Sequence, residues 1–227
     1  EVGLRYDWSM MPTERYNRFI IFDITTGSLA RVGTQIGGIY QTHNKTLQPR
    51  VGFAWDPFHS GKTSVRAAYA VLADQPLVSL VTSTSANPPL AMPLTVTGSI
   101  RFGNAITLAR PAGLAPQNVD HGFNNAYLQS WNLNVERELA HDLAAMVGYF
   151  ASKGRHVTLR RNINQPINGV RPYPTLSSAS AILSGTETVL GNVVQAESTG
   201  NSNYNALWAN AKRRFAHGLS FNVSYTW

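Results

Sequence analysis

The last nine residues of the chain alternate without exception between apolar and polar side chains. The apolar positions are Leu219, Phe221, Val223, Tyr225 and Trp227, and only serine, asparagine and threonine lie between them. Successive side chains of a β-strand point to opposite faces, so this segment predicts a strand with one apolar and one uncharged polar face. Such a strand, of roughly ten residues and rich in aromatic side chains, is typical of a transmembrane barrel. Soluble β-sandwiches contain similar strands, so the rest of the chain decides between the two.

Six further segments share this period of two and are bounded by turn residues, which predicts β-strands. They are Val2–Trp8, Leu47–Trp55, Thr63–Ala73, Ser130–Leu139, Leu143–Ser152 and Tyr204–Phe215. Leu143–Ser152 is apolar on both parities, so its sequence leaves open which face it turns outward. Residues 18–23 and 28–32 are expected to extend strands or form a small hairpin, and 156–160 to continue the preceding strand. The prediction is an all-β chain, an antiparallel meander of about seven long strands, and no segment is assigned to a helix.

The connections between these strands alternate in length. Three are short, at residues 56–62, 140–142 and 216–218, and three are long, at about 9–46, 74–129 and 153–203. Compact soluble domains rarely contain connections as long as the second set. Outer-membrane barrels have this asymmetry, because their periplasmic turns are tight and their extracellular loops are long. The strands and the connections together predict part of a large transmembrane β-barrel, with the long loops as its substrate-contacting surface.

The composition excludes several other classes of protein. Only 14% of the 227 residues are charged, against roughly 25% in ordinary soluble proteins. The chain has no cysteine, which excludes disulfides and thiolate metal sites. Its net charge of +7 is scattered, with tight clusters only at 160–161 and 212–214, so nucleic-acid binding is not expected. No apolar run approaches the roughly 20 residues of a transmembrane helix.

Charged and aromatic residues lie where a membrane wall would place them. Arg137 and Arg213 interrupt otherwise apolar faces, but each lies within about two residues of a short turn, where an outward arginine costs only about 0–1 kcal/mol. Trp8, Trp55, Trp131, Tyr149 and Trp227 lie towards the predicted strand ends, as in an aromatic girdle. The inward parity carries Arg50, Arg66, Glu136, Lys212 and Arg214. They are expected mainly to hydrate the interior, and alternatively to set selectivity or contact a plug domain.

No sequence motif predicts catalysis or cofactor binding. The nucleotide-binding, zinc-protease and hydrolase signatures are missing from the sequence. The six histidines are dispersed over loops and turns without metal-ligand spacing: His43, His59, His121, His141, His156 and His217. The pairs Asp120–His121 and His141–Asp142 are expected to be ordinary polar residues of turns or loops, without a catalytic role. Catalytic, cofactor-binding and metal sites are therefore all predicted to be none, and the chain is not expected to be an enzyme.

Several blocks, in order along most of the chain, resemble the barrel of TonB-dependent receptors of the Oar-like type. They lie at residues 49–58, 61–69, 129–139, 147–154, 161–166, 202–207, 212–215 and 224–227, with the loops 75–120 and 170–198 matching least. The resemblance implies a 22-stranded barrel that usually follows a carboxypeptidase-regulatory-like domain and a plug. Residues 1–227 are accordingly expected to be a partial barrel domain without plug, TonB box or signal peptide, and Trp227 to be a point of truncation.

The expected function is that of an outer-membrane receptor or transporter barrel in a Gram-negative bacterium. Its expected partners are membrane lipid, the TonB complex through a plug outside this chain, and an unknown large substrate. Two alternatives stay open on the sequence: a passive porin or surface-adhesion barrel, and a soluble β-sandwich that binds carbohydrate.

Overall fold

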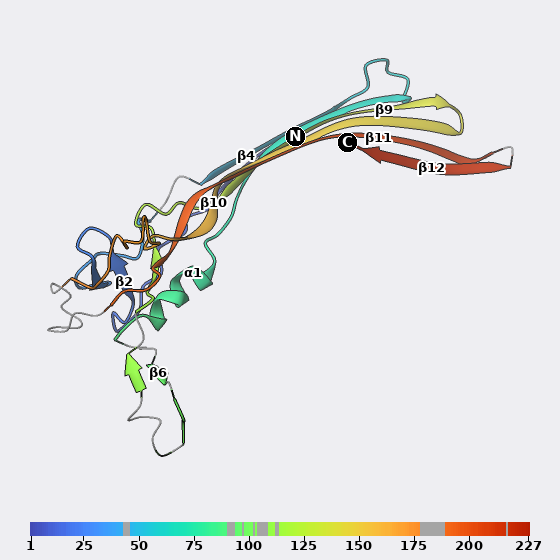
Figure 1. The fold of residues 1–227 in the computed structure, drawn as a ribbon. Helices are drawn as coiled ribbons and strands as arrows, with labels where there is room; N and C mark the ends of the chain where they lie inside the picture. Colours follow the sequence, from blue (N-terminus) through green and yellow to red (C-terminus); the bar gives the residue numbers. More distant parts are fainter. Residues whose placement is uncertain are drawn as a thin grey trace.

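The computed structural model describes residues 1–42, 46–89, 94–96, 98–101, 103, 109–111, 114–177, 189–216 and 218–227. Seven of the eight strands of the main sheet follow one another in sequence order: β1 (Val2–Tyr6), β4 (Leu47–Trp55), β5 (Thr63–Ala73), β9 (Tyr127–Ala140), β10 (Leu143–Asn162), β11 (Val194–Ala216) and β12 (Leu219–Thr226). Each pairs antiparallel with the next in sequence order, from β1 at one edge to β12 at the other. The predicted meander is confirmed, and Figure 1 shows it as one long, curved sheet.

The strand boundaries match the prediction best where the alternation is strict. β4 and β5 begin and end at the predicted residues, but β10 and β11 have 20 and 23 residues, about twice the expected length. Residues 156–160 do continue β10, through a bulge at which His156 has φ 56°. Opposite the bulge, a Cβ on Gly200 would lie 2.6 Å from the Val157 carbonyl oxygen, so only glycine fits there.

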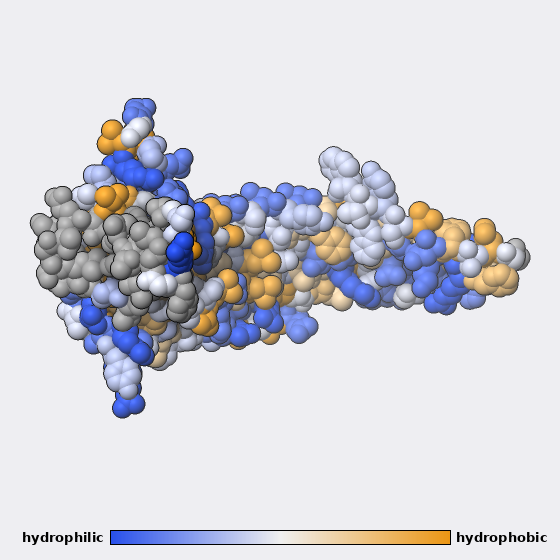
Figure 2. Space-filling model, turned by 60° about the horizontal axis from the view of Figure 1, so that its bottom comes forward, coloured by the Kyte–Doolittle hydropathy of each residue, from blue (hydrophilic) through white to orange (hydrophobic). Residues whose placement is uncertain are grey.

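The register joins the apolar positions of neighbouring strands into one continuous face. Phe53 pairs with Ala67, Ala67 with Leu133, Leu133 with Tyr149, and Tyr149 with Leu207. These pairings place Val147 and Tyr149 on the apolar face and leave Met146 and Phe150 on the polar one, which answers the question that the sequence of this strand left open. Leu133 and Val147 are 48% and 52% exposed, and Figure 2 shows hydrophobic side chains spread along the sheet. An exposed apolar surface of this extent needs an apolar environment.

Most described parts of the long connections fold together into a unit, here called the cap, at the end of the sheet opposite the short turns (Figure 1). Its elements are the hairpin β2 (Ile20–Asp23) and β3 (Ser28–Arg31), helix α1 (Val78–Thr82), the 3₁₀ turn η1 (Ser83–Ala86) and β8 (Gln117–Val119). The pair β6 (Leu94–Val96) and β7 (Ala109–Pro111) extends away from this unit (Figure 1). The expected small hairpin is confirmed, and β8 pairs parallel with the upper end of β11. Residues 194–196 of β11, which pair with β8, therefore join the main sheet to the cap.

The helix α1 was not predicted, and its sequence explains why. Its five residues, Val-Ser-Leu-Val-Thr, are mostly poor helix formers, and a helix this short is marginal by itself. Leu80 and Val81 are buried in the cap, so tertiary packing decides the conformation. The all-β prediction is confirmed for the chain, and this one short helix is an addition that the sequence pattern did not indicate. No helix among the described residues is long and apolar enough to cross a membrane.

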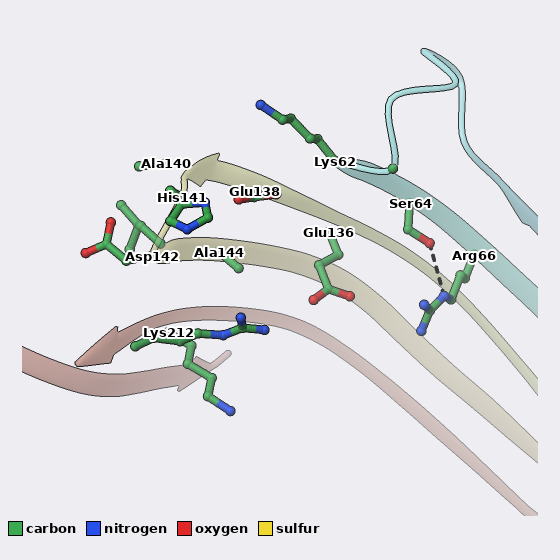
Figure 3. Close-up of a pocket in the computed structure, with 13 residues that line it drawn as sticks. Lys62, Ser64, Arg66, Glu136, Glu138, Ala140, His141, Asp142, Ala144 and Lys212 are labelled. Atoms are coloured by element: carbon green, nitrogen blue, oxygen red, sulfur yellow. Dashed lines mark hydrogen bonds between the residues drawn. The ribbon is translucent and has the colours of Figure 1, made fainter. Parts of the chain in front are cut away.

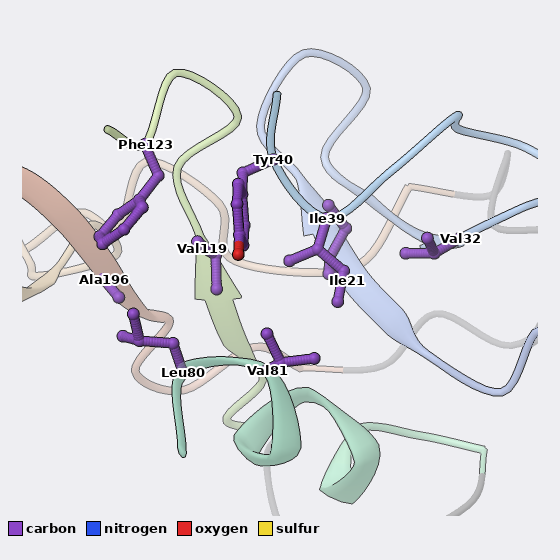
Figure 4. Close-up of a cluster of buried hydrophobic side chains, with 9 residues drawn as sticks. All are labelled: Ile21, Val32, Ile39, Tyr40, Leu80, Val81, Val119, Phe123 and Ala196. Carbon is purple, nitrogen blue, oxygen red and sulfur yellow. The ribbon is translucent and has the colours of Figure 1, made fainter. Parts of the chain in front are cut away.

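Most of the buried apolar side chains of the described residues lie in the cap rather than in the sheet. One cluster is drawn in Figure 4 and joins residues from three parts of the chain: Ile21, Val32, Ile39, Tyr40, Leu80, Val81, Val119, Phe123 and Ala196. A second joins Ile20, Phe22, Leu29, Leu114, Leu176, Leu190 and Val193. Burial of one such large side chain stabilises a fold by roughly 1.5–3 kcal/mol. The connections therefore form a folded unit with its own core.

Glu14, in the first connection, provides a pH-dependent test of the cap. Its Oε1 accepts hydrogen bonds from Nε and Nη2 of Arg18 at 3.0 and 2.6 Å, and Oε2 accepts from the backbone N–H groups of Tyr16 and Arg18. The side-chain bond from Arg18 is the main reason that the pKa of Glu14 falls to about 2. Because the pKa of Glu14 is lower in the folded protein, the ionised carboxylate stabilises the fold at pH values above the ordinary pKa of glutamate. This stabilisation is lost as the pH falls towards 2.

We expect carboxyl-detected NMR to show Glu14 titrating with a midpoint near 2. Arg18→Ala should return the midpoint towards the ordinary glutamate range, and Arg18→Lys should leave it in between, because lysine lacks the planar fork of donors. A midpoint unchanged by Arg18→Ala would contradict this assignment.

Candidate functional site

The polar face of the sheet is hollowed next to the short turns. The hollow has a volume of about 440 Å³, and β5, β9, β10, β11 and the turns between them all contribute to its lining. Its charged side chains are Lys62, Arg66, Glu136, Glu138, Asp142, Lys212 and Arg214. Figure 3 labels six of these side chains and shows that they come from neighbouring strands and turns of the sheet.

The register explains why this part of the sheet is concave. Glu138 on β9 and Lys212 on β11 both pair with Ala144 on β10, which lies between them. A methyl group therefore lies between two long charged side chains. Ala144 lines the hollow between these two side chains.

Most charges in the hollow have no partner among the described residues. No ion pair joins Glu136 or Glu138 to a basic side chain in the described chain, and Arg66 donates only to Ser64 Oγ, at 3.1 Å. Asp142 is paired outside the hollow, with Arg213 at 2.7 Å. Four basic side chains and two acidic ones remain, so the hollow presents charges of both signs with a basic excess of two.

Four of the five predicted inward residues meet in this hollow. Arg66, Glu136, Lys212 and Arg214 line it, whereas Arg50 lies on the same face beside Gly3 and Ala70 and does not. The prediction overlooked Glu138, although its even position in the alternation places it on the inward face. Lys62 was overlooked because it lies in a turn, where the alternation of strand side chains does not indicate which face a residue is on.

The comparison with protein families decides the class of this sheet. The whole chain, residues 1–227, matches the sequence model of the family described as "Outer membrane beta barrel domain". The chain belongs to this outer-membrane β-barrel family. The expected membership of an outer-membrane barrel family and the location in the outer membrane of a Gram-negative bacterium are therefore confirmed. The family match contradicts the alternative of a soluble β-sandwich, because the matched family is one of outer-membrane barrels.

One solved structure of an outer-membrane transporter supports the barrel fold, and two further structures align with lower scores. The outer membrane transporter YddB from Escherichia coli aligns with a TM-score of 0.51 at 8% identity, over 82% of this chain and 20% of that one. The FrpB iron transporter from Neisseria meningitidis (TM-score 0.44, 14% identity) and the siderophore receptor PirA from Pseudomonas aeruginosa (0.43, 12%) each align over 80% of this chain and over 19% and 28% of theirs. No curated protein matches the chain. The chain thus spans about a fifth of the YddB barrel protein.

The two arginines on the lipid-facing side of the barrel wall both contact residues of the short turns, near which their positions were predicted. Arg213 pairs with Asp142, and the guanidinium of Arg137 lies 5.5 Å from the ring centre of Phe58 in the first short turn. Both side chains therefore reach the interfacial end of the barrel wall, where long basic side chains commonly extend out of the membrane.

The aromatic girdle is only partly supported by the barrel structure. Trp55 is the last residue of β4, next to a short turn. Tyr149, however, is the seventh residue of β10, and its hydroxyl lies 2.8 Å from Asn205 Oδ1. Its expected position near a strand end was wrong, because the strand is twice as long as the sequence pattern indicated.

The histidines and acidic residues of the barrel form no cluster that suggests metal binding. Among the residues that the structure describes, no group of three or more histidine, aspartate and glutamate side chains is arranged to hold a metal ion. His59 and His141 lie in short turns, as predicted, while His43 and His217 lie outside the described residues. That the chain has no catalytic, cofactor or metal site stays a prediction.

Proposed function

We propose that the chain forms the wall and cap of an outer-membrane receptor that takes up a large substrate, with a plug domain seated in the barrel and energy supplied through TonB. The observation that carries this proposal is the charged hollow on the polar face. That face is the inside of the barrel, and the short turns next to the hollow belong to its periplasmic side.

The charges of the hollow support a folded partner inside the barrel. Side chains of both signs project into one concave space and are unpaired within the wall, which suits complementary charges on a second surface. The plug itself would lie outside residues 1–227. The transporters to which the fold is similar are several times longer than this chain, and their activities come to it only as part of this proposal.

The proposal can be tested by ion conductance of the intact protein in planar lipid bilayers. We expect the wild type to be nearly closed, because the plug fills the barrel. The double variant Lys212→Glu/Arg214→Glu should conduct readily, because it reverses two charges of the hollow and loosens the plug. Arg50→Glu is the matched control on the same face but outside the hollow, and it should stay closed.

Two outcomes would decide against this function. A wild-type protein that already conducts freely would indicate the passive pore that the sequence left open. A double variant that stays as closed as Arg50→Glu would show that the hollow does not hold a plug. Heat-modifiable migration in gel electrophoresis should be the same for all three proteins, because none of these changes faces lipid or the cap core.

A further inference from the structure

The lipid-facing side of the wall ends in two cations next to the cap. Side chains of one strand alternate between faces, so Lys153 and Arg155 lie on the same side of β10 as Tyr149. The outward residues of β9 that pair with this part of β10 run from the apolar middle towards the cap: Leu133, Trp131, Gln129 and Tyr127. The outward face therefore changes from apolar to polar and basic. This order is typical of the interface between the hydrocarbon core and the lipid headgroups.

The charges of these two cations are not balanced within the wall. Neither side chain forms an ion pair with an acidic residue of the described chain. Arg155 Nη1 donates a hydrogen bond of 2.9 Å to Asn201 Oδ1, and the strand partners of Lys153 are the uncharged Gln129 and Asn203. Two positions along a strand span about 7 Å, so one phosphate group can lie between both side chains.

The end of the same face next to the short turns is different. There Arg213 is paired with Asp142 at 2.7 Å, and the guanidinium of Arg137 lies over the ring of Phe58. The lipid-facing cations of one interface thus have partners within the protein, whereas those of the cap end have no acidic partner in the described chain. Basic side chains at a membrane interface attract anionic lipid headgroups. The unbalanced charge therefore indicates phosphate in the leaflet beside the cap.

A cavity of about 220 Å³ adjoins the two cations on the outward face. Leu47 and Ala73 contribute apolar surface to it, and the rings of Tyr127 and His156, with centres 5.7 Å apart, line it as well. Tyr127 pairs with Ala73 on one side and with Arg155 on the other, so the cavity lies one strand away from the basic pair. Tyrosine has an apolar ring and a polar tip, which suits contact with the ring of a sugar.

We infer that Lys153, Arg155 and this cavity bind the headgroup of a phosphorylated glycolipid of the outer leaflet. The phosphate contacts Lys153 and Arg155 through charge-assisted hydrogen bonds, and the sugar ring lies against Tyr127. In a Gram-negative outer membrane, phosphorylated glycolipid is a main component of the leaflet that faces outward, the side on which the long connections of a barrel lie. This inference goes beyond the proposed uptake function, because it requires neither a plug nor TonB.

The test is native mass spectrometry of the intact protein in neutral detergent micelles with added lipid A. We expect saturable binding, and at least about tenfold weaker binding of lipid A that has been dephosphorylated, because the charge-assisted hydrogen bonds are lost. Phosphatidic acid, which has a phosphate but no sugar, should also bind more weakly than lipid A. The double variant Lys153→Gln/Arg155→Gln should bind lipid A at least about tenfold more weakly and should no longer distinguish it from the dephosphorylated form.

Arg15→Gln/Arg50→Gln is the matched control, because it removes two positive charges from exposed residues that lie in the first connection and on the polar face. It should bind lipid A as the wild type does. Heat-modifiable migration in gel electrophoresis shows that each variant is folded before binding is compared.

Three results would overturn the inference: equal binding of lipid A and its dephosphorylated form, equal loss of binding in the two double variants, or equal binding of lipid A and phosphatidic acid. The first two would show that Lys153 and Arg155 do not recognise phosphate, and the third that no sugar is recognised. None of them bears on the conductance of the barrel, so the glycolipid site and the plugged-receptor function fail separately.

Discussion

Ala67→Arg is expected to destabilise the barrel by about 2–4 kcal/mol, and Ala68→Arg to leave its stability nearly unchanged. The two residues are adjacent in β5 and identical in type, but they face opposite sides. Ala67 pairs with Phe53 and Leu133 in the middle of the apolar face, whereas Ala68 pairs with Gly52 and Asn132 on the polar face. An arginine at the first position meets lipid near the midplane, and at the second it meets the water-filled interior.

The measurement is guanidinium unfolding of the intact protein after refolding into phospholipid vesicles. Each variant is the control for the other, because length, charge and strand propensity change equally. Equal destabilisation by the two substitutions would show that the apolar face does not contact lipid. A larger effect of Ala68→Arg would mean that the face of Ala68, and not that of Ala67, contacts lipid.

Asn87→Ala is expected to cost the cap about 3 kcal/mol, the second large effect. Asn87 is buried, and its loss leaves the carbonyls of Ile20 and Gln117 and the N–H of Gln117 without partners. Buried polar groups that lose their hydrogen bonds cost roughly 1–3 kcal/mol each. The hydrogen bonds of Asn87 reach residues 67 and 30 positions away in the sequence. The side chain of Asn87 therefore links the first long connection to the second.

Hydrogen exchange followed by mass spectrometry should localise this loss. Peptides from the cap should exchange faster in Asn87→Ala. Peptides from β9 and from residues 143–152 of β10, next to the short turn, should keep their protection. Asn201→Ala is a suitable control, since Asn201 is exposed and outside both apolar clusters. Unchanged exchange in the cap would show that Asn87 does not hold the connections together.

The wall could be predicted from the sequence because its pattern is local. Strict alternation gave the bounds of β4 and β5, and the parity of single residues identified Arg66, Glu136, Lys212 and Arg214 as inward-facing. The continuation of β10 through residues 156–160 was expected, but the first half of β11, residues 194–203, was missed because its residues are mostly polar on both parities. Tertiary pairing, through a bulge at His156, keeps them in the sheet.

The cap could not be predicted because its contacts are distant in sequence. Ile20 and Leu190 belong to one cluster, and Tyr40 and Phe123 to the other, with ring centres 5.6 Å apart. No periodicity marks such residues in advance.

The location of the core in the cap has a consequence for how the protein is assembled. The wall is stabilised where lipid surrounds it, whereas the cap is stabilised by withdrawing apolar side chains from water. Its clusters draw on all three long connections, which meet only after the strands that carry them lie side by side. The cap is therefore expected to be the last part to form, on the outer surface, once the strands have crossed the membrane.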